Sequence, residues 1–178
     1  MGSEQLKSER EKQRRNTLLV CQTGIIAALY VALTYVFAPI SFGAVQVRIA
    51  EALTILPILT PAAIPGVTIG CLLGNILGGG IPMDIIFGTL ATLIGAVCTY
   101  LLRKKHPVFG AIPPIVSNTL IVPFVIKFAY GDTMALPLIM LSVCAGEIIS
   151  CGVIGVPFAL ALKKSGALVH GKKTEKED

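Results

Sequence analysis

The basic residues of this chain lie in three clusters, separated by long apolar runs with few charges. Five basic residues precede Asn16, a second cluster comprises Arg103, Lys104 and Lys105, and five more follow Leu162. The apolar runs exceed the roughly 20 residues that one bilayer crossing requires. Only 14% of the residues are charged and the mean hydropathy is +0.80, whereas about a quarter of the residues of a soluble domain are charged. The sequence therefore predicts an all-α membrane protein.

The first apolar run extends from Thr17 to Ala38. It is longer than the roughly 7–15 residues of the apolar region of a secretory signal peptide, and no convincing small-residue cleavage site follows it. We therefore expect this run to be retained as the first membrane span.

The basic clusters also predict the topology, because Lys and Arg favour the cytoplasmic side of a membrane. Both termini and residues 103–105 are then cytoplasmic, so an odd number of crossings must lie between the first span and Arg103. Three short crossings, with breaks at Thr60–Pro65 and Gly78–Pro82, account for the apolar sequence better than one. Two further spans, at about Pro107 to Tyr130 and Thr133 to Leu162, give six transmembrane helices with cytoplasmic N and C termini.

This topology divides the chain into three parts. Residues 1–16 form a basic cytoplasmic head whose polar composition allows disorder. Residues 17–165 form the six-helix membrane domain, and residues 166–178 form a polar cytoplasmic tail.

Small residues recur at every fourth position in two of the expected helices and so form ridges. They are Gly66, Gly70, Gly74 and Gly78 in the third helix, and Gly24, Ala28 and Ala32 in the first. For the glycines, internal packing is favoured over contact with another subunit. For the residues of the first helix, internal packing and a flat surface for another protein both remain open.

Polar side chains within membrane spans are costly and usually functional. The candidates are Gln46, Arg48, Glu51, Asn75, Asp84, Asn118, Lys127 and Glu147. Lys127 can extend toward the membrane surface and is assigned no role. Most of the others fall in the outer half of the expected helices, which predicts a pocket open to the outside and closed toward the cytoplasm by apolar packing.

Several of these residues have structural alternatives. Arg48 and Glu51 share a helix face and can neutralise each other, which is as well supported as ligand contact. Asp84 follows a proline at a helix start, where helix capping is favoured, and Asn118 can bridge two helices. Glu147 is the strongest candidate for ligand contact, because it lies mid-span with no charged neighbour on its own helix.

The sequence indicates neither a metal site nor a nucleotide site. Its five cysteines fall in apolar runs without a CxxC pair or a Cys/His cluster, so we interpret them as structural. The tail sequence GALVHGKKT resembles a phosphate-binding loop, but Lys173 occupies the Ser/Thr position and no strand precedes it. We therefore expect no nucleotide site in this chain and no metal or redox role for its cysteines.

Five stretches carry a family resemblance across about residues 17–165. They are VRIAEALTILP, PGVTIGCLLGNILGG, DIIFGTLATLIGA, PPIVSN and AGEII, in that order. They resemble the QueT family, whose members are substrate-binding membrane subunits (S components) of energy-coupling factor (ECF) transporters for queuosine precursors. The resemblance implies a six-helix S component in a prokaryotic cell membrane that captures a 7-deazaguanine base from outside.

The resemblance implies a transport subunit that is not itself an enzyme, and it also implies partners. Transport would require a transmembrane coupling protein and two cytoplasmic ATPases that use ATP, so this chain itself would need no cofactor and no nucleic acid. Ala28 and Ala32 match the small-residue surface that the first helix of S components typically presents to the coupling protein, and Gly24 continues that surface by one turn.

The chemistry of a 7-deazaguanine suggests how the candidates would share its recognition. Its adjacent N–H donors suit a carboxylate that accepts both, for which Glu147 is the candidate. Its carbonyl and ring nitrogens would pair with amides, for which Asn118, Asn75 and Gln46 are available.

An aminomethyl precursor additionally carries a cation, which suits Glu51 or Asp84. In this hypothesis Arg48 orients Glu51 and keeps it ionised. Two alternatives remain: an S component for another small metabolite such as a vitamin, and a non-transport structural subunit that assembles through the glycine ridge.

Overall fold

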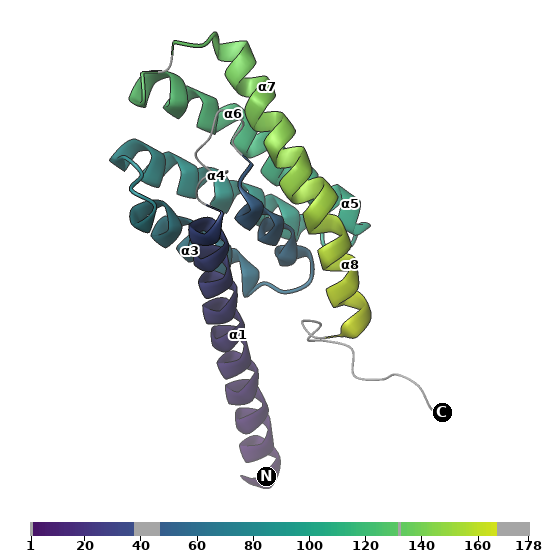
Figure 1. Ribbon diagram of the computed structural model, residues 1–178. Helices are drawn as coiled ribbons and strands as arrows, with labels where there is room; N and C mark the ends of the chain where they lie inside the picture. Colours follow the sequence, from purple (N-terminus) through teal and green to yellow (C-terminus); the bar gives the residue numbers. More distant parts are fainter. Residues whose placement is uncertain (1, 38–46, 132, 167–178) are drawn as a thin grey trace.

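The computed structural model describes residues 2–37, 47–131 and 133–166, and every regular element within those ranges is a helix (Figure 1). The elements are α1 (Gly2–Val36), η1 (Ile49–Ile58), α3 (Ala63–Leu77), α4 (Pro82–Leu101), α5 (Pro107–Gly110), α6 (Ile112–Ala129), α7 (Leu136–Glu147), η2 (Ile148–Gly155) and α8 (Val156–Ser165). Most are α-helical, but η1 is a 3₁₀-helix and η2 is a π-helix. The all-helical prediction is confirmed.

Four continuous helical stretches are long and apolar enough to cross a membrane. They are Glu4–Val36, Pro82–Leu101, Pro107–Ala129 and Leu136–Ser165. Two shorter apolar helices, Ile49–Ile58 and Ala63–Leu77, lie between the first and second of these. The chain is therefore a multi-pass membrane protein, whereas six full crossings and the orientation of the termini remain predictions.

The two short helices come from the part of the sequence where we expected two breaks. The first break covers residues 59–62, so Pro65 lies in the first turn of α3 and not in the break, and a first-turn proline removes no intrahelical hydrogen bond. The second break, at residues 78–81, agrees with the prediction. Gly79 there has a φ of 76°, a left-handed conformation that glycine adopts without strain.

Helix η1 lies at the centre of the fold, and all its residues from Ala50 to Ile58 are buried. It contacts α1, α3, α4, α5, α6, η2 and α8. Because a 3₁₀-helix rises about 2.0 Å per residue and an α-helix about 1.5 Å, the ten residues of η1 extend nearly as far as the fifteen of α3.

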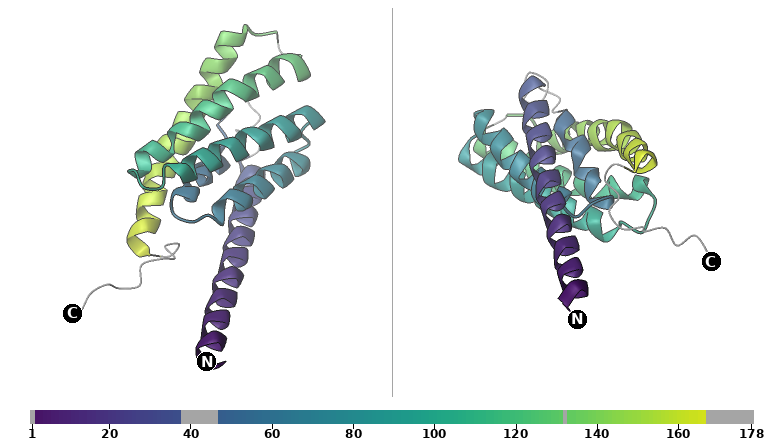
Figure 2. Two further views of the ribbon diagram at one scale, coloured as in Figure 1. Left: turned by 180° about the vertical axis from the view of Figure 1, so that it is seen from behind. Right: turned by 90° about the horizontal axis from the view of Figure 1, so that it is seen from below.

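The remaining helices surround η1. Helices α3, α4 and α6 lie side by side, α1 packs against α3, and α7, η2 and α8 form one continuous helical rod on the other side (Figures 1 and 2). The N-terminal half of α1 extends beyond the other helices (Figure 2). The main apolar core lies between α1, η1, α3 and α4, and includes Ile26, Leu53, Leu56, Val67 and Ala96.

The glycine ridge of α3 packs inside the chain. Gly66, Gly70 and Gly74 lie against Ile26, Tyr30 and Thr34 of α1, respectively. Since they have no side chains, the two helices approach closely, which confirms the favoured interpretation of internal packing. The same contact covers these three glycines, so the alternative of assembly with another subunit through them is wrong. Gly78, the fourth residue of the predicted ridge, directly follows α3 and is exposed.

The small residues of α1 lie on its opposite face. Gly24, Ala28 and Ala32 are exposed, whereas Ile26, Ala27 and Tyr30 on the inner face are buried. A Cβ atom added to Gly24 would have no neighbour within 4 Å. This face is therefore available for contact with lipid or with another protein.

Candidate functional site

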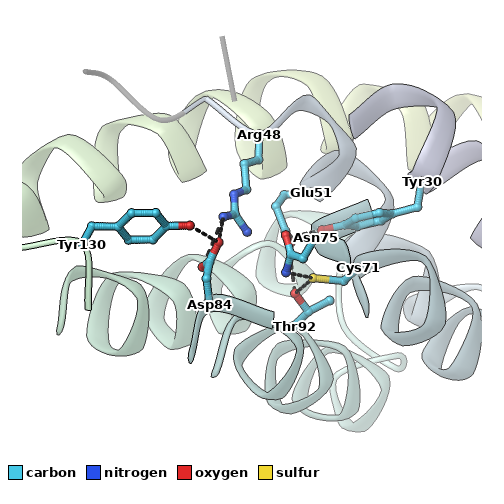
Figure 3. Close-up of polar contacts among 8 residues, drawn as sticks. All are labelled: Tyr30, Arg48, Glu51, Cys71, Asn75, Asp84, Thr92 and Tyr130. Carbon is cyan, nitrogen blue, oxygen red and sulfur yellow. Dashed lines mark hydrogen bonds and ion pairs between the residues drawn. The ribbon is translucent and has the colours of Figure 1, made fainter. Parts of the chain in front are cut away.

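The predicted polar residues converge where several elements end. Arg48 immediately precedes η1, Asp84 lies in the first turn of α4, and Asn75 lies in the last turn of α3. Tyr130 directly follows α6 and reaches back to the same region (Figure 3). Gln46, the remaining predicted residue of this group, lies outside the described residues.

An ion pair joins the start of η1 to the start of α4. Arg48 Nη2 lies 3.3 Å from Asp84 Oδ2 and 3.5 Å from Oδ1. The Tyr130 hydroxyl donates to Asp84 Oδ2 at 3.3 Å, and its partial burial together with the Asp84 charge raises the pKa of Tyr130, so it remains a donor. We had expected Arg48 to orient Glu51. We had expected Asp84 mainly to cap its helix. In the structure, Arg48 instead pairs with Asp84.

Glu51 lies deeper, with only 1% of its surface exposed. Its Oε1 atom accepts hydrogen bonds from the Tyr30 hydroxyl and, at 3.3 Å, from Thr92 Oγ1. Its Oε2 atom is buried and has no hydrogen-bond partner within the described part of the chain. Because a buried carboxylate oxygen is costly to leave without a donor, this atom marks a place where a ligand donor would be favourable.

Thr92 and Asn75 extend the polar cluster through a thiol. Thr92 Oγ1 lies 3.3 Å from Cys71 Sγ, and Asn75 Nδ2 lies 3.5 Å from the same sulfur (Figure 3). All three residues are buried, so the cluster connects the inner faces of α3 and α4 beside Glu51.

Glu147 forms a second buried carboxyl group next to Glu51. Its Oε1 atom accepts from Asn118 Nδ2 at 2.9 Å, and its Oε2 atom lies 3.3 Å from Cys151 Sγ. The same sulfur lies 3.3 Å from the backbone oxygen of Glu51. Asn118 also lies close to the Glu51 carboxyl group, so it bridges helices, as its structural alternative predicted, and joins both acids.

The helix changes form directly after Glu147. Residues Ile148–Gly155 are π-helical, and π segments occur frequently at functional sites. A Cβ atom on Gly155 would lie 2.9 Å from the backbone oxygen of Ala52, so η2 packs directly on η1. This contact places Glu147 beside Glu51, and the buried Ser150 hydroxyl of η2 has no partner among the described residues.

The chemistry of this centre is acidic and rich in acceptors. It contains the carboxyl groups of Glu51 and Glu147, whereas Arg48 is already paired with Asp84. Such a centre suits a ligand with adjacent N–H donors or a positive charge. Within the described ranges, no three His, Cys, Asp or Glu side chains are placed to hold a metal ion.

A separate groove lies between α4 and α6. It has a volume of about 680 Å³ and is lined by apolar residues such as Met83, Phe87, Leu120 and Phe124, all of which are exposed. It offers no polar side chain for recognition and lies on a face suited to lipid, so we do not assign the substrate to it.

Sequence reasoning missed five residues that contact the predicted ones. They are Tyr30, Cys71, Thr92, Tyr130 and Cys151. Helical spacing could have found three of them, because Cys71 is four residues from Asn75, Cys151 is four from Glu147 and Thr92 is eight from Asp84. Tyr30 and Tyr130 had no such signal, since each reaches its partner from a different helix.

The fold and the polar centre define a multi-pass helical membrane protein with buried groups suited to binding a small molecule. A family profile described as QueT transporter matches residues 20–164. The chain therefore belongs to the QueT transporter family, which confirms the resemblance seen in the sequence. The family is a transporter family, in agreement with the expectation that this chain is not an enzyme.

One relative is the queuosine precursor transporter QueT of Lactococcus lactis subsp. cremoris (strain MG1363). It is 36% identical to this chain over 84 residues, which are 46% of this chain and 49% of the relative. The matched part of this chain thus spans about half the length of that relative. No solved structure matches the chain.

Proposed function

We propose that this chain is the substrate-capture subunit of an ATP-driven ECF-type uptake transporter, and that it binds a queuosine precursor of the 7-deazaguanine type. Membership of a transporter family and the name of the Lactococcus relative, a queuosine precursor transporter, support transport of this substrate class. The single observation that supports the site best is the buried Oε2 atom of Glu51, which has no hydrogen-bond partner among the described residues and lies beside the Glu147 carboxyl group.

In this proposal, Glu147 recognises the Watson–Crick edge of the base. In the present structure its Oε1 atom accepts from Asn118 and its Oε2 atom contacts Cys151. The two N–H donors of a 7-deazaguanine would replace these contacts. The released Asn118 amide would then donate to the carbonyl of the base. Since hydrogen bonds are exchanged and not lost, binding need not leave a buried polar group without a partner.

Glu51 supplies the next acceptor. Tyr30 and Thr92 hold one of its oxygens, so the other oxygen has a defined position. That free oxygen suits an additional N–H donor or the ammonium group of an aminomethyl precursor. Asn75, which lies near Thr92 through Cys71, is available to a ring nitrogen of the base.

The proposed topology places this centre toward the outside. With both termini and residues 103–105 in the cytoplasm, the start of η1 and the start of α4 face outward, so Arg48 and Asp84 lie between the outer solution and Glu51. The proposal includes six crossings of the cell membrane, with the head at 1–16 and the tail at 166–178 in the cytoplasm. Two of those crossings would use the short helices η1 and α3.

Energy would come from other subunits. The exposed face of α1 that contains Gly24, Ala28 and Ala32 would contact a transmembrane coupling protein, because small residues let a partner helix approach closely. Two cytoplasmic ATPases bound to that protein would hydrolyse ATP, and this chain would bind neither nucleotide nor nucleic acid.

Identification of a co-purified ligand tests the proposal most directly. Mass spectrometry of small molecules released from the purified chain should detect a 7-deazaguanine, and calorimetry with 7-aminomethyl-7-deazaguanine should give saturable binding. Release of a vitamin, with no binding of deazaguanines, would instead support an S component for another metabolite. Failure of the chain to bind any small molecule would favour a structural subunit.

The role of Glu51 can be tested against a matched exposed glutamate. Glu51→Gln should weaken deazaguanine binding. Tyr30 and Thr92 already donate to one of the two carboxylate oxygens, so the amide group that replaces the other oxygen would face the donor of the ligand. Glu9→Gln, on the exposed N-terminal half of α1, should leave binding unchanged. Equal affinity of the Glu51 variant and the parent would exclude Glu51 from the site.

A further inference from the structure

A small basic pocket lies at the opposite end of η1 from the polar centre. It has a volume of about 130 Å³ and is lined by Ile58, Leu59, Arg103, Lys105, Pro107 and Lys163. Arg48 precedes the first residue of η1 and Ile58 is its last, so the length of this helix, about 20 Å, separates the two places. The pocket is therefore distinct from the candidate substrate site.

Three cations from separate parts of the chain meet at this pocket. Arg103 and Lys105 come from the connection between α4 and α5, and Lys163 comes from the last turn of α8. The Arg103 guanidinium lies 4.2 Å from the centroid of the Tyr100 ring, which limits its orientation. No carboxylate of the described residues forms an ion pair with any of the three, so their charge is available to an external anion.

The other side of the pocket is apolar. Ile58 is buried, Leu59 is half-buried and Pro107 is buried, so the lining combines three exposed cations with three apolar residues that form its floor in our interpretation. The pocket is well below the roughly 300 Å³ of typical sites for drug-sized molecules. Its size and lining suit one anionic group that is attached to an apolar body.

The position of the pocket matches the head-group layer of a membrane. Apolar α4 ends at Leu101, the next apolar stretch begins at Pro107, and α8 ends at Ser165. Basic pockets at the ends of transmembrane helices bind the head groups of anionic lipids. In the proposed topology this end of the helices faces the cytoplasm, where anionic lipids give the membrane surface its negative potential, so the inference rests on that topology.

We propose that this pocket binds a phosphate-bearing anion, with the head group of an anionic phospholipid as its source. The phosphate contacts Arg103, Lys105 and Lys163, and the glycerol region of the lipid lies on Ile58, Leu59 and Pro107. Free inorganic phosphate has the same charge chemistry but would leave the apolar floor uncovered. The binding would secure the ends of α4 and α8 to η1, whose other end carries the substrate site.

The chain offers a matched control for this proposal. Lys104 lies between Arg103 and Lys105 in the sequence, and Lys164 directly follows Lys163. Both lysines are exposed, but neither lines the pocket. The double variants K105Q/K163Q and K104Q/K164Q therefore remove the same charge from the same two segments. If anionic lipids were attracted only by the general positive charge near this end of the helices, both double variants would weaken lipid binding equally.

Native mass spectrometry of the full chain in detergent, titrated with phosphatidylglycerol, tests the site. We expect one tightly bound lipid, with affinity lowered on the order of tenfold in K105Q/K163Q and less than twofold in K104Q/K164Q. The conservative variant K105R/K163R should retain binding. Equal losses in the two glutamine variants, or equal affinity of the parent for phosphatidylcholine, would overturn the proposal.

A second arm separates the two sources of phosphate. If 10 mM inorganic phosphate displaces phosphatidylglycerol from the parent but not from K105Q/K163Q, the pocket is an anion site whose ligand is free phosphate, and the lipid assignment is overturned. If phosphate does not displace the lipid, the lipid assignment is supported. Deazaguanine binding should be the same in both glutamine variants, so this experiment is independent of the proposed substrate.

Discussion

Gly70 of α3 lies directly against Tyr30 of α1: a Cβ atom on Gly70 would be 2.6 Å from Cβ of Tyr30 and 3.1 Å from the backbone oxygen of Ala27. Tyr30 in turn donates its hydroxyl to Glu51. The packing of two membrane helices is thus coupled to the position of a buried carboxyl group. A change at Gly70 should affect both stability and ligand binding.

Gly70→Ala should therefore destabilise the protein by about 1–3 kcal/mol, because the added methyl group overpacks the contact. The helices must separate, and Tyr30 then moves relative to Glu51, so deazaguanine affinity should fall as well. Thermal unfolding in detergent and calorimetric titration measure the two effects. Gly24→Ala is the control, since a Cβ atom there meets nothing within 4 Å; equal stability of both variants and the parent would contradict the close contact.

The Arg48–Asp84 ion pair should show energetic coupling in a double-mutant cycle. Arg48 and Asp84 have side-chain exposures of only 11% and 3%, so removing one partner leaves a poorly solvated charge behind. R48Q and D84N should each lower the stability, and the double variant should recover part of the loss, with a coupling of about 0.5–3 kcal/mol. Additive effects in thermal unfolding would mean that the pair does not stabilise the fold.

Sequence patterns predicted the long helices well because length and apolarity are local properties. The spans that end at Val36, Leu101, Ala129 and Ser165 lie, within a few residues, where apolar runs with few charges between basic clusters and turns predict them. The 3₁₀ form of η1 was not predictable in this way. Its nine residues from Ala50 to Ile58 are buried by contacts with seven other elements, and tertiary packing of that kind has no periodicity in the sequence.

The sequence predicted most residues of the candidate site but not which of them contact each other. Charged and amide residues in apolar runs are conspicuous, so Arg48, Glu51, Asp84, Asn118 and Glu147 could be selected from the sequence. Their partners depend on which helices are neighbours. A sequence spacing of three suggested that Arg48 and Glu51 pair, but η1 begins only after Arg48, whose side chain instead reaches α4.

The orientation of the chain can be tested by cysteine labelling on a background without native cysteines. Cysteines near residue 104 and near residue 170 should react only with a reagent that has access to the cytoplasm, whereas a cysteine at Gly131 should react from outside. Gly131 lies between α6 and α7 and is exposed. Labelling of position 104 from outside would reverse the topology and place the polar centre toward the cytoplasm.

The exposed face of α1 should matter for assembly but not for capture. Replacing Ala28 or Ala32 by leucine adds bulk to a face that no described residue covers closely, so ligand binding by the isolated subunit should remain nearly unchanged. Co-purification with the coupling protein should be weakened, because bulky side chains prevent close helix approach. Intact assembly together with a collapse of ligand affinity would place these alanines in internal packing or in the site.

Glu147→Gln should discriminate most sharply between a ligand carboxylate and a structural one. The substitution preserves size but turns one acceptor into a donor that would face a donor of the base. Loss of a charge-assisted hydrogen bond and an unpaired buried donor should together cost about 2–4 kcal/mol, or roughly 30- to 1000-fold in affinity. Calorimetric titration of the purified protein with the deazaguanine measures this loss.

An analogue without the exocyclic amine provides the matching test of geometry. It presents one donor fewer to the acid, so Glu147→Gln should weaken its binding less than that of the full base. The Asn118 amide, which donates to Glu147 at 2.9 Å without ligand, can still turn toward the carbonyl that both compounds share. If the variant binds both compounds as the parent does, Glu147 serves only to hold Asn118 and Cys151, and ligand recognition must lie around Glu51, Arg48 and Asp84.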